Sequence, residues 1–368
     1  MAPRPTTGSS MLREAQPLTA GHPGGRRGSR LRQVIGPCLL AGAVLAAVSA
    51  LALASGRYNV SVDHVVQILA SRIVPFGPDL PAAEENVVLL VRLPRVLLAL
   101  LVGGALAIGG TALQAVFRNP LVSPEVIGVS SGASFGGALA LLLGLGPVAL
   151  VGGSFGFGLL ALGIVFLITS GRGGAHILMV VLGGIVTASF FSALVALVTY
   201  LADPFTTLPA IVFWLLGSVS TATWAKVLVA LVPIAAGGVV LLALRWRINV
   251  LSLGDDDATA LGLRPRPLRW VVLAAVALMV AGAVAVSGVI SWVGLVIPHL
   301  ARMWVGPDHR VLLPVSFLLG GAYLIAIDTI ARTATAGEIP LGVLTALIGA
   351  PVFFVLLRRN RERIWDGA

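Results

Sequence analysis

The sequence predicts an all-α protein that crosses a membrane with about ten helices. Hydrophobic residues make up 57% of the chain and charged residues only 11%, with a mean hydropathy of +1.00. Soluble domains are about 45–50% apolar. Long uncharged runs also recur along the chain, each near or above the ~20 residues that a spanning helix needs. Lipid is therefore expected to surround most of the protein.

Two of these runs are too long for one crossing. Residues 126–171 contain the helix breaker Gly144-Leu145-Gly146-Pro147, and residues 271–300 contain Ser287-Gly288. Each run is expected to fold back as two helices, which brings the total to ten. The other six runs are residues 34–54, 96–117, 177–202, 227–244, 311–327 and 339–357.

Two segments leave alternatives open. Residues 204–225 are apolar but interrupted by Pro209 and Gly217, so they predict a short outer helix or a re-entrant piece. If they span the membrane instead, the count becomes eleven. The first run, residues 34–54, ends in Ala52-Leu53-Ala54 like a signal peptide, but its length favours a retained helix.

The distribution of positive charge predicts the orientation. With ten spans and the N-terminus inside, all but six of the 25 Lys and Arg residues fall on the cytoplasmic side, as basic residues in short loops do. Both termini are then cytoplasmic. The exceptions are Arg57, Arg72, Arg92, Arg95, Lys226 and Arg332.

The same charge pattern argues against several function classes. The net charge of +10 is a topology signal here, so no nucleic-acid partner is expected. Lys226 is the only lysine and follows Ala225, which excludes a GxxxxGK[ST] phosphate loop. The five histidines show no paired metal spacing, and Cys38 is alone. The chain is therefore expected to be no enzyme and to hold no metal or cofactor.

A polar segment, residues 245–269, interrupts the apolar sequence and must lie outside lipid. Three consecutive acids, Asp255, Asp256 and Asp257, stand at its centre, and Arg264, Arg266 and Arg269 follow. The organisation is thus a disordered basic tail over residues 1–33, a membrane domain over residues 34–359 that contains this segment, and a C-terminal tail over residues 360–368. We expect another molecule to contact the segment on the cytoplasmic side.

Several multi-residue motifs, in order over residues 34–359, resemble the permease subunits of FecCD-type ABC importers for iron-siderophore, haem and cobalamin. The resemblance implies a ten-helix type II importer permease fold in a bacterial cell membrane. It also implies a second permease subunit, cytoplasmic ABC ATPases and an extracytoplasmic substrate-binding protein as partners, besides membrane lipid. The motifs are Arg92-Leu93-Pro94-Arg95, Asn119-Pro120-Leu121 through Gly132-Ala133, Val293-Gly294-Leu295 through Pro298-His299, Asp308-His309-Arg310 through Pro314, and Pro340-Leu341-Gly342 through Gly349-Ala350-Pro351.

In the resembling family, the polar segment forms short coupling helices that dock on the ATPase. Glycines can start or end such helices, and acids suit a helix N-terminus. The alternative is that the acids merely cap a solvated helix. The expected coupling residues are Leu251, Gly254, Asp255, Asp256, Asp257, Ala258, Leu261 and Gly262.

The resemblance also implies that Arg92, Arg95 and Arg332 dock acidic residues of the binding protein, since guanidinium groups suit carboxylates. For Arg92 and Arg95 the alternative is snorkelling at the interface. For Arg332 it is a pair with Asp328, four residues earlier on the same helix.

The helix over residues 177–202 matches the family's pathway-lining helix. Its small flank could equally serve close helix packing. The expected lining residues are Gly183, Gly184, Thr187, Ala188 and Ser192.

The predicted function is the permease subunit of an ATP-driven importer of iron(III)-siderophore complexes. Haem and cobalamin are alternative cargoes within the same family. A self-contained secondary transporter is the alternative of another class, but it needs carboxylates on broken helices near the membrane midplane. Only Asp328 is available for that purpose, and it lies near a helix end.

Overall fold

The computed structural model describes residues 26–56, 58–72, 80–170, 177–335 and 337–359. These residues form helices joined by turns and contain no strand. Seven of the helices are long and apolar enough to cross a membrane, and three shorter apolar helices bring the set to ten. The predicted all-α polytopic fold is therefore confirmed. Residues 1–25 and 360–368 of the predicted tails lie outside the described residues.

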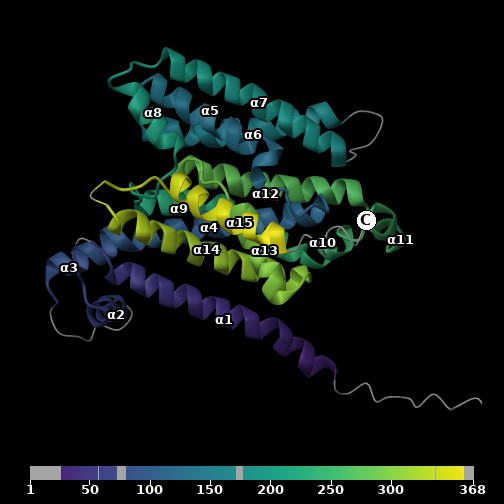
Figure 1. Cartoon of the computed structure of the whole chain (residues 1–368), viewed down its shortest axis with the longest axis horizontal. Coiled ribbons are helices and arrows are strands. Elements are labelled where there is room, and N and C mark those ends of the chain that lie inside the picture. The colour runs from purple at the N-terminus through teal and green to yellow at the C-terminus, as the bar shows by residue number, and fades with distance from the viewer. Residues whose placement is uncertain (1–25, 57, 73–79, 171–176, 336, 360–368) are drawn as a thin grey trace, which may run out of the picture.

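The helices follow the predicted runs closely (Figure 1). The long ones are α1 (Arg26–Ala54), α4 (Leu93–Val116), α6 (Pro147–Thr169), α7 (Ile177–Leu201), α9 (Trp224–Ala243), α12 (Pro265–Ser287) and α14 (His309–Thr333). The three shorter apolar ones are α5 (Val129–Leu142), α13 (Val293–Val305) and α15 (Leu341–Arg359). The remaining elements are α2 (Val62–Ser71), α3 (Ala82–Asn86), the π-helical turn η1 (Val87–Arg92), η2 (Pro124–Ile127), α8 (Thr207–Leu215), α10 (Arg245–Leu251) and α11 (Asp255–Ala260).

Helix breakers divide the two long runs where the sequence predicts. Gly144, with φ of 63°, lies in the turn between α5 and α6, and Gly288, with φ of 67°, follows α12. Within residues 204–225, α8 has nine residues, a length of about 14 Å against the ~30 Å hydrocarbon core. The structure therefore supports a short helix there and not an eleventh span.

Two helix starts differ from the predicted ones. Helix α1 begins at Arg26, inside the segment predicted to be a tail. The predicted span over residues 96–117 belongs to a continuous helical stretch that begins at Ala82 and runs through α3, η1 and α4. Charged residues ahead of the apolar run therefore also lie on a helix, which decides the environment of Arg92 and Arg95.

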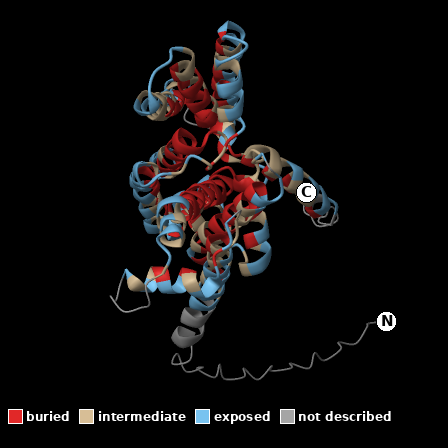
Figure 2. Ribbon diagram, turned by 90° about the vertical axis from the view of Figure 1, so that its left-hand side faces the viewer, coloured by how far each residue is buried: buried red, intermediate tan, exposed pale blue. Residues whose placement is uncertain are grey.

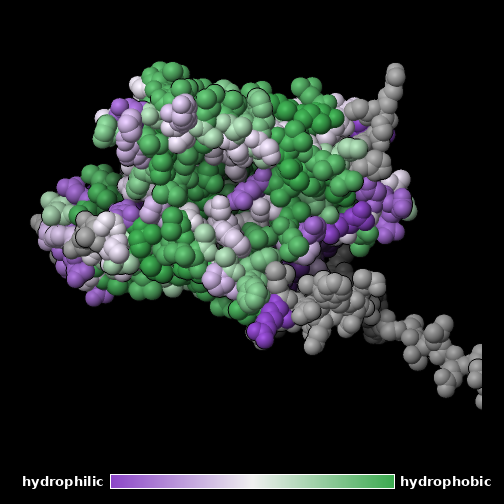
Figure 3. Space-filling view, turned by 45° about the horizontal axis from the view of Figure 1, so that its top comes forward, coloured by the Kyte–Doolittle hydropathy of each residue, from purple (hydrophilic) through white to green (hydrophobic). Residues whose placement is uncertain are grey.

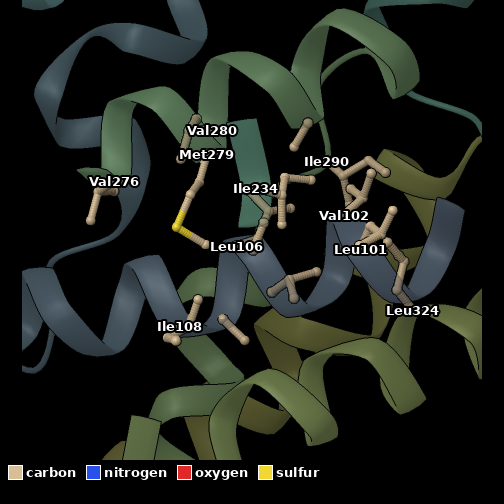
Figure 4. Close-up of a cluster of buried hydrophobic side chains, with 14 of the residues drawn as sticks. Leu101, Val102, Leu106, Ile108, Ile234, Val276, Met279, Val280, Ile290 and Leu324 are labelled. Atoms are coloured by element: carbon tan, nitrogen blue, oxygen red, sulfur yellow. The ribbon is translucent and has the colours of Figure 1, made fainter. Parts of the chain in front are cut away.

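Helix α4 lies at the centre of the bundle and contacts α9, α12, α13 and α14. Its backbone touches that of α14 where two glycines meet: a Cβ on Gly103 would lie 2.3 Å from the carbonyl oxygen of Gly320. Only glycine permits this approach. Leu106, Ile234 and Met279, from α4, α9 and α12, form part of the core beside it (Figure 4).

Helix α12 joins two groups of helices. On one side it packs against α5 and α6, which form a group with α7 and α8, and on the other it packs against α4 and α9. Figures 1 and 2 show the α5–α8 group as a separate layer, with buried residues concentrated toward the interior. The two groups share α12 as their common packing surface.

The helices run roughly parallel to one another, so the bundle has two distinct ends. Helices α10 and α11 lie at one end, and α2 and α3 lie at the other (Figure 1). Hydrophobic side chains cover much of the face shown in Figure 3, and hydrophilic ones gather mainly toward its ends. The predicted coupling segment and the predicted arginine set therefore occupy opposite ends.

Candidate functional site

The polar segment forms two short helices, α10 and α11, separated by a turn. Gly254, with φ of 137°, is the N-cap of α11, and Gly262, with φ of 79°, follows its end. Both φ values lie in the region that favours glycine. The three consecutive aspartates fill the first turn of α11, where the unpaired N–H groups of a helix favour negative charge.

Asn249 fixes α10 to the start of α14. Its Nδ2 donates to Oδ1 of Asp308 at 2.6 Å, and its Oδ1 accepts from the backbone N–H of His309 at 2.8 Å. The ring Nδ1 of His309 lies 2.6 Å from the same Oδ1. Asp308 is also the N-cap of α14, with Oδ1 accepting from the backbone N–H of Arg310 at 3.0 Å. These hydrogen bonds therefore connect α10 directly to the start of α14.

Asp255 fixes α11 to the start of α12. One of its carboxylate oxygens lies 2.7 Å from Nη2 of Arg269, whose side chain is buried. The neighbouring Asp256 and Asp257 are exposed. All three aspartates are thus exposed, and Asp255, whose side chain is 50% exposed, also anchors α11 to Arg269.

Two leucines on this polar segment are exposed. Leu253 is 60% exposed and Leu261 is 58% exposed, at either end of α11. In contrast, Leu251, Gly254 and Ala258, three of the predicted coupling residues, are buried. We call four of the exposed residues of this segment, Leu253, Asp256, Asp257 and Leu261, the α11 surface. An apolar side chain that lies outside lipid gains free energy when a partner protein shields it from water.

At the opposite end, the predicted docking arginines form a buried cluster. Arg92, Arg95 and Arg332 are 4%, 8% and 9% exposed. Nε of Arg95 lies 3.0 and 2.9 Å from the two carboxylate oxygens of Asp328, and its Nη2 donates to Oδ1 at 2.8 Å. Nη1 and Nη2 also donate to the two oxygens of Glu338, at 2.9 and 3.0 Å. Arg95 thereby connects α4 to α14 and to the turn before α15.

The other two arginines bind the end of α1. Nη1 of Arg92 donates to the carbonyl oxygens of Leu53 and Ala54, at 2.6 and 2.9 Å, and Nη2 donates to that of Tyr58. Arg332 donates to the carbonyl oxygen of Ala52. Positive charge at a helix C-terminus is favourable because the last carbonyl groups lack helical partners. The cluster therefore holds α1 against α4 and α14.

These contacts refine the expectations for the three arginines. None of them snorkels, because each is buried with partners inside the chain. Asp328 does pair with Arg332 at 3.8 Å, as the spacing of four predicts, but Arg95 is its closer partner. The role of the cluster in docking a binding protein stays a prediction.

The small residues of α7 divide between packing and exposure. A Cβ on Gly184 would lie 2.1 Å from the carbonyl oxygen of Val126, and Gly183 and Thr187 are also buried. These three residues pack within the subunit, which is the alternative that the sequence left open. Ala188 is half-buried, whereas Ser192 is exposed. A pathway-lining role stays a prediction, and the burial favours it only for Ser192 among the five.

Sequence reasoning missed three residues that shape these sites. Asn249 and Glu338 are polar residues beside predicted spans, and their partners are 60 and 243 residues away in sequence. Leu253 is apolar, so its residue type did not distinguish it from the many other leucines of the chain. The only available clue was that a leucine within a charged, solvent-exposed segment has no lipid to cover it.

Comparison with known proteins agrees with this architecture. The model of the FecCD transport family matches residues 44–359. The chain belongs to the FecCD family. It is thus a multi-pass ABC transporter permease, with ten apolar helices described.

Other FecCD permeases with different cargoes align over most of the chain. The molybdate import system permease protein MolB of Haemophilus influenzae is 44% identical over 87% of this chain and 94% of its own length. The cobalamin import system permease protein BtuC of Halobacterium salinarum is 36% identical over 89% of this chain and 90% of its own length. The hemin transport system permease protein HmuU of Yersinia pestis is 40% identical over 74% of this chain and 83% of its own length.

A solved structure supports the fold of this FecCD permease. It is described as an inward-facing conformation of a metal-chelate type ABC transporter. It superposes with a TM-score of 0.80, at 42% identity, and covers 88% of this chain and 99% of that one.

Proposed function

We propose that this FecCD protein is the permease subunit of an ATP-driven importer and that α10 and α11 couple it to a separate ATPase. The observation that carries the proposal is the α11 surface, which exposes Leu253 and Leu261 beside two carboxylates. The segment is joined to α14 through Asn249 and to α12 through Asp255. A partner that binds it could therefore move two long helices directly.

We assign the ATPase to a separate subunit, because residues 1–368 contain no phosphate-binding loop. The only lysine, Lys226, lacks the preceding glycine of that motif. It also lies in the first turn of α9, whose other end leads into α10. ATP hydrolysis is accordingly assigned to a cytoplasmic ABC subunit that contacts the α11 surface.

The α11 end is assigned to the cytoplasm of a bacterial cell. Arg245, Arg264 and Arg310 lie beside α10, α11 and the start of α14, and short basic loops favour the cytoplasmic side. Both termini then face the cytoplasm. The arginine cluster is at the outer end, where an extracytoplasmic binding protein would deliver substrate.

A second permease subunit, identical or different, is assigned to the exposed face of α7. Leu182, Val186 and Phe190 are exposed there at helical spacing, and α7 contains no charged residue. We place the translocation path between the two subunits, along the exposed side of α7, where Ser192 is also exposed. A weakly polar wall allows a bulky chelate to pass without being trapped.

Iron(III)-siderophore is the proposed cargo, with haem and cobalamin as alternatives in the same class. A large chelate with a saturated metal needs no ligand from the permease, and the uncharged α7 suits it. Molybdate is a second candidate, because the 44% identical relative is a molybdate permease. A small dianion is expected to require polar or basic groups along its path, so the apolar face of α7 favours the chelate.

Uptake by proteoliposomes tests the proposal. The permease is reconstituted with its ATPase and binding protein, and radiolabelled ferric siderophore, haem, cobalamin and molybdate are compared with and without internal ATP. We expect ATP-dependent uptake of the siderophore complex. Uptake that persists without the ATPase subunit would indicate a secondary transporter, and ATP-dependent uptake of molybdate alone would overturn the cargo.

A further inference from the structure

A groove runs along the membrane surface of the bundle between α6 and α9. Its floor is α12, which packs against both helices. The cavity has a volume of about 430 Å³. Its walls are apolar, and they include Val151 and Phe155 from α6, Val232 and Pro233 from α9, and Leu278 and Gly282 from α12.

The groove opens into a wider hollow at the end of the bundle opposite α11. This hollow has a volume of about 840 Å³ and shares Val151, Gly152, Val229 and Ala285 with the groove, so the two are continuous. Polar residues line the part of it near the start of α9, which we call its border. Ser218, Ser220, Thr221, Thr223 and Lys226 lie there.

Lys226 is the only lysine of the chain and is half-buried at this border. Its Nζ donates to Oγ1 of Thr221 at 2.6 Å. Among the described residues, no carboxylate lies within ion-pair distance of it. Lys226 also lies in the first turn of α9, whose N-cap is Thr223, and a helix N-terminus attracts negative charge.

We propose that this groove binds one anionic phospholipid, with an acyl chain in the groove and the phosphate at Lys226. The dimensions match this ligand. From Lys226 to Ala236, at the inner part of the groove, α9 rises by about 15 Å, half of a ~30 Å hydrocarbon core. The groove and the hollow together thus have the depth of one leaflet. Lys226, which has no carboxylate within ion-pair distance among the described residues, lies where the headgroup of that leaflet begins. With α11 in the cytoplasm, this is the outer leaflet.

Native mass spectrometry of the full-length protein can count bound lipids. The protein is incubated with phosphatidylglycerol or with phosphatidylcholine of the same acyl chains. We expect wild type to retain one phosphatidylglycerol preferentially. Lys226→Gln should lower this retention about five-fold, since one basic residue contributes about 1 kcal/mol to binding an anionic lipid. Lys226→Arg keeps the charge and should retain the lipid.

A second variant tests the groove without touching the charge. A Cβ on Gly152 meets nothing within 4 Å, so Gly152→Leu should fit on α6 and fill the groove, and lipid retention should fall. Gly163→Leu is the matched control, because Gly163 lies on the same helix, is equally unobstructed and does not line the groove. Arg72→Gln controls for loss of positive charge at the same end.

Three outcomes would overturn the proposal. The first is that Lys226→Gln retains as much phosphatidylglycerol as wild type does. The second is equal retention of phosphatidylcholine by wild type, which would mean that the groove holds acyl chains without selecting a headgroup. The third is displacement of the lipid by equimolar glycerol 3-phosphate, which would mean that a free phosphate suffices and the groove contributes nothing.

Discussion

Arg95 and Asp328 form a buried ion pair that joins α4 to α14, with three guanidinium hydrogen bonds of 2.8 to 3.0 Å to the carboxylate. The side chains are 10% and 4% exposed. The fork of Arg95 is shared with Glu338, so one cation balances two acids. Arg332, 3.8 Å from Asp328, supplies the second positive charge.

Removing Asp328 is predicted to destabilise the protein. In Asp328→Ala, Arg95 and Arg332 lose their common partner while remaining buried, and a broken buried pair costs about 3–5 kcal/mol. The free energy of unfolding in detergent measures this loss. Arg72→Ala breaks the exposed pair with Glu85 and should cost less than about 1 kcal/mol. Equal effects of the two substitutions would contradict a structural role for Asp328.

Removing the amide of Asn249 is predicted to loosen α10 from α14. Asn249→Ala loses the contacts to Asp308 and His309, at a cost of about 1–2 kcal/mol. We expect hydrogen exchange in α10 to rise and stimulation of the ATPase by substrate to fall. Asp308→Asn keeps an oxygen acceptor for the Asn249 amide and for the N-cap, so it should raise hydrogen exchange in α10 less than Asn249→Ala does. Unchanged exchange in α10 in the Asn249 variant would count against the anchor.

The stability contributed by Asp308 is predicted to depend on pH. Burial raises its pKa, but the backbone N–H of Arg310 and the Asn249 amide more than offset this, so the pKa lies below the ordinary aspartate value. The contribution is therefore full above the ordinary aspartate pKa and is lost as the pH falls through the lowered one. Comparing wild type with Asp308→Asn across this acid range measures it. A difference between them that does not shrink with falling pH would refute the assignment.

The α11 surface is predicted to bind the ATPase through its leucines. Replacing Leu253 and Leu261 by Asp should abolish co-purification of the ATPase, because the exposed apolar contact is lost. Replacing Asp256 and Asp257 by Ala should weaken the association with the ATPase. The remaining affinity should depend less on salt concentration, because two charges are lost. Substitution of Thr259, which is exposed on the same helix, provides a control. Normal association in both double variants would rule out this surface.

The contact between α7 and η2 is predicted to tolerate no side chain at Gly184. Gly184→Ala places a Cβ 2.1 Å from the carbonyl oxygen of Val126, so the helices must separate and the melting temperature should fall. Gly163→Ala enters open space and should raise it, since alanine is about 0.5–1 kcal/mol better than glycine inside a helix. A rise of the same size in both variants would show that helix propensity, not the contact with Val126, governs the effect at Gly184.

The spans could be predicted because lipid imposes a length and a composition on each helix separately. Gly144 and Gly288 even marked where the two long runs divide. The arginine cluster could not be predicted, because the partners of each arginine depend on which helices pack together. Arg95 and Asp328, for example, are 233 residues apart in sequence. The pattern identified the charges as exceptional, but whether they face outward or inward was decided by the helical extension from Ala82 and by the end of α1.

The polar segment, residues 245–269, was likewise predictable in part. Its location outside lipid followed from composition, and Gly254 and Gly262 correctly indicated helix boundaries. The inward direction of Leu251 in α10 and of Ala258 in α11 did not follow, because helices of seven and six residues have too few positions to reveal a buried face. The partners of Asn249 were equally hidden, since they come from a different span.

Helix α12 begins beside α11, where Arg269 holds Asp255, and ends at Ser287 near the opposite end of the bundle. Its 23 residues correspond to a rod of about 35 Å. Because this rod packs against both helix groups, a tilt imposed at Asp255 changes the angle between the layers along its whole length. A single ion pair thus connects the short helix α11 to a helix that is long enough to cross the bilayer.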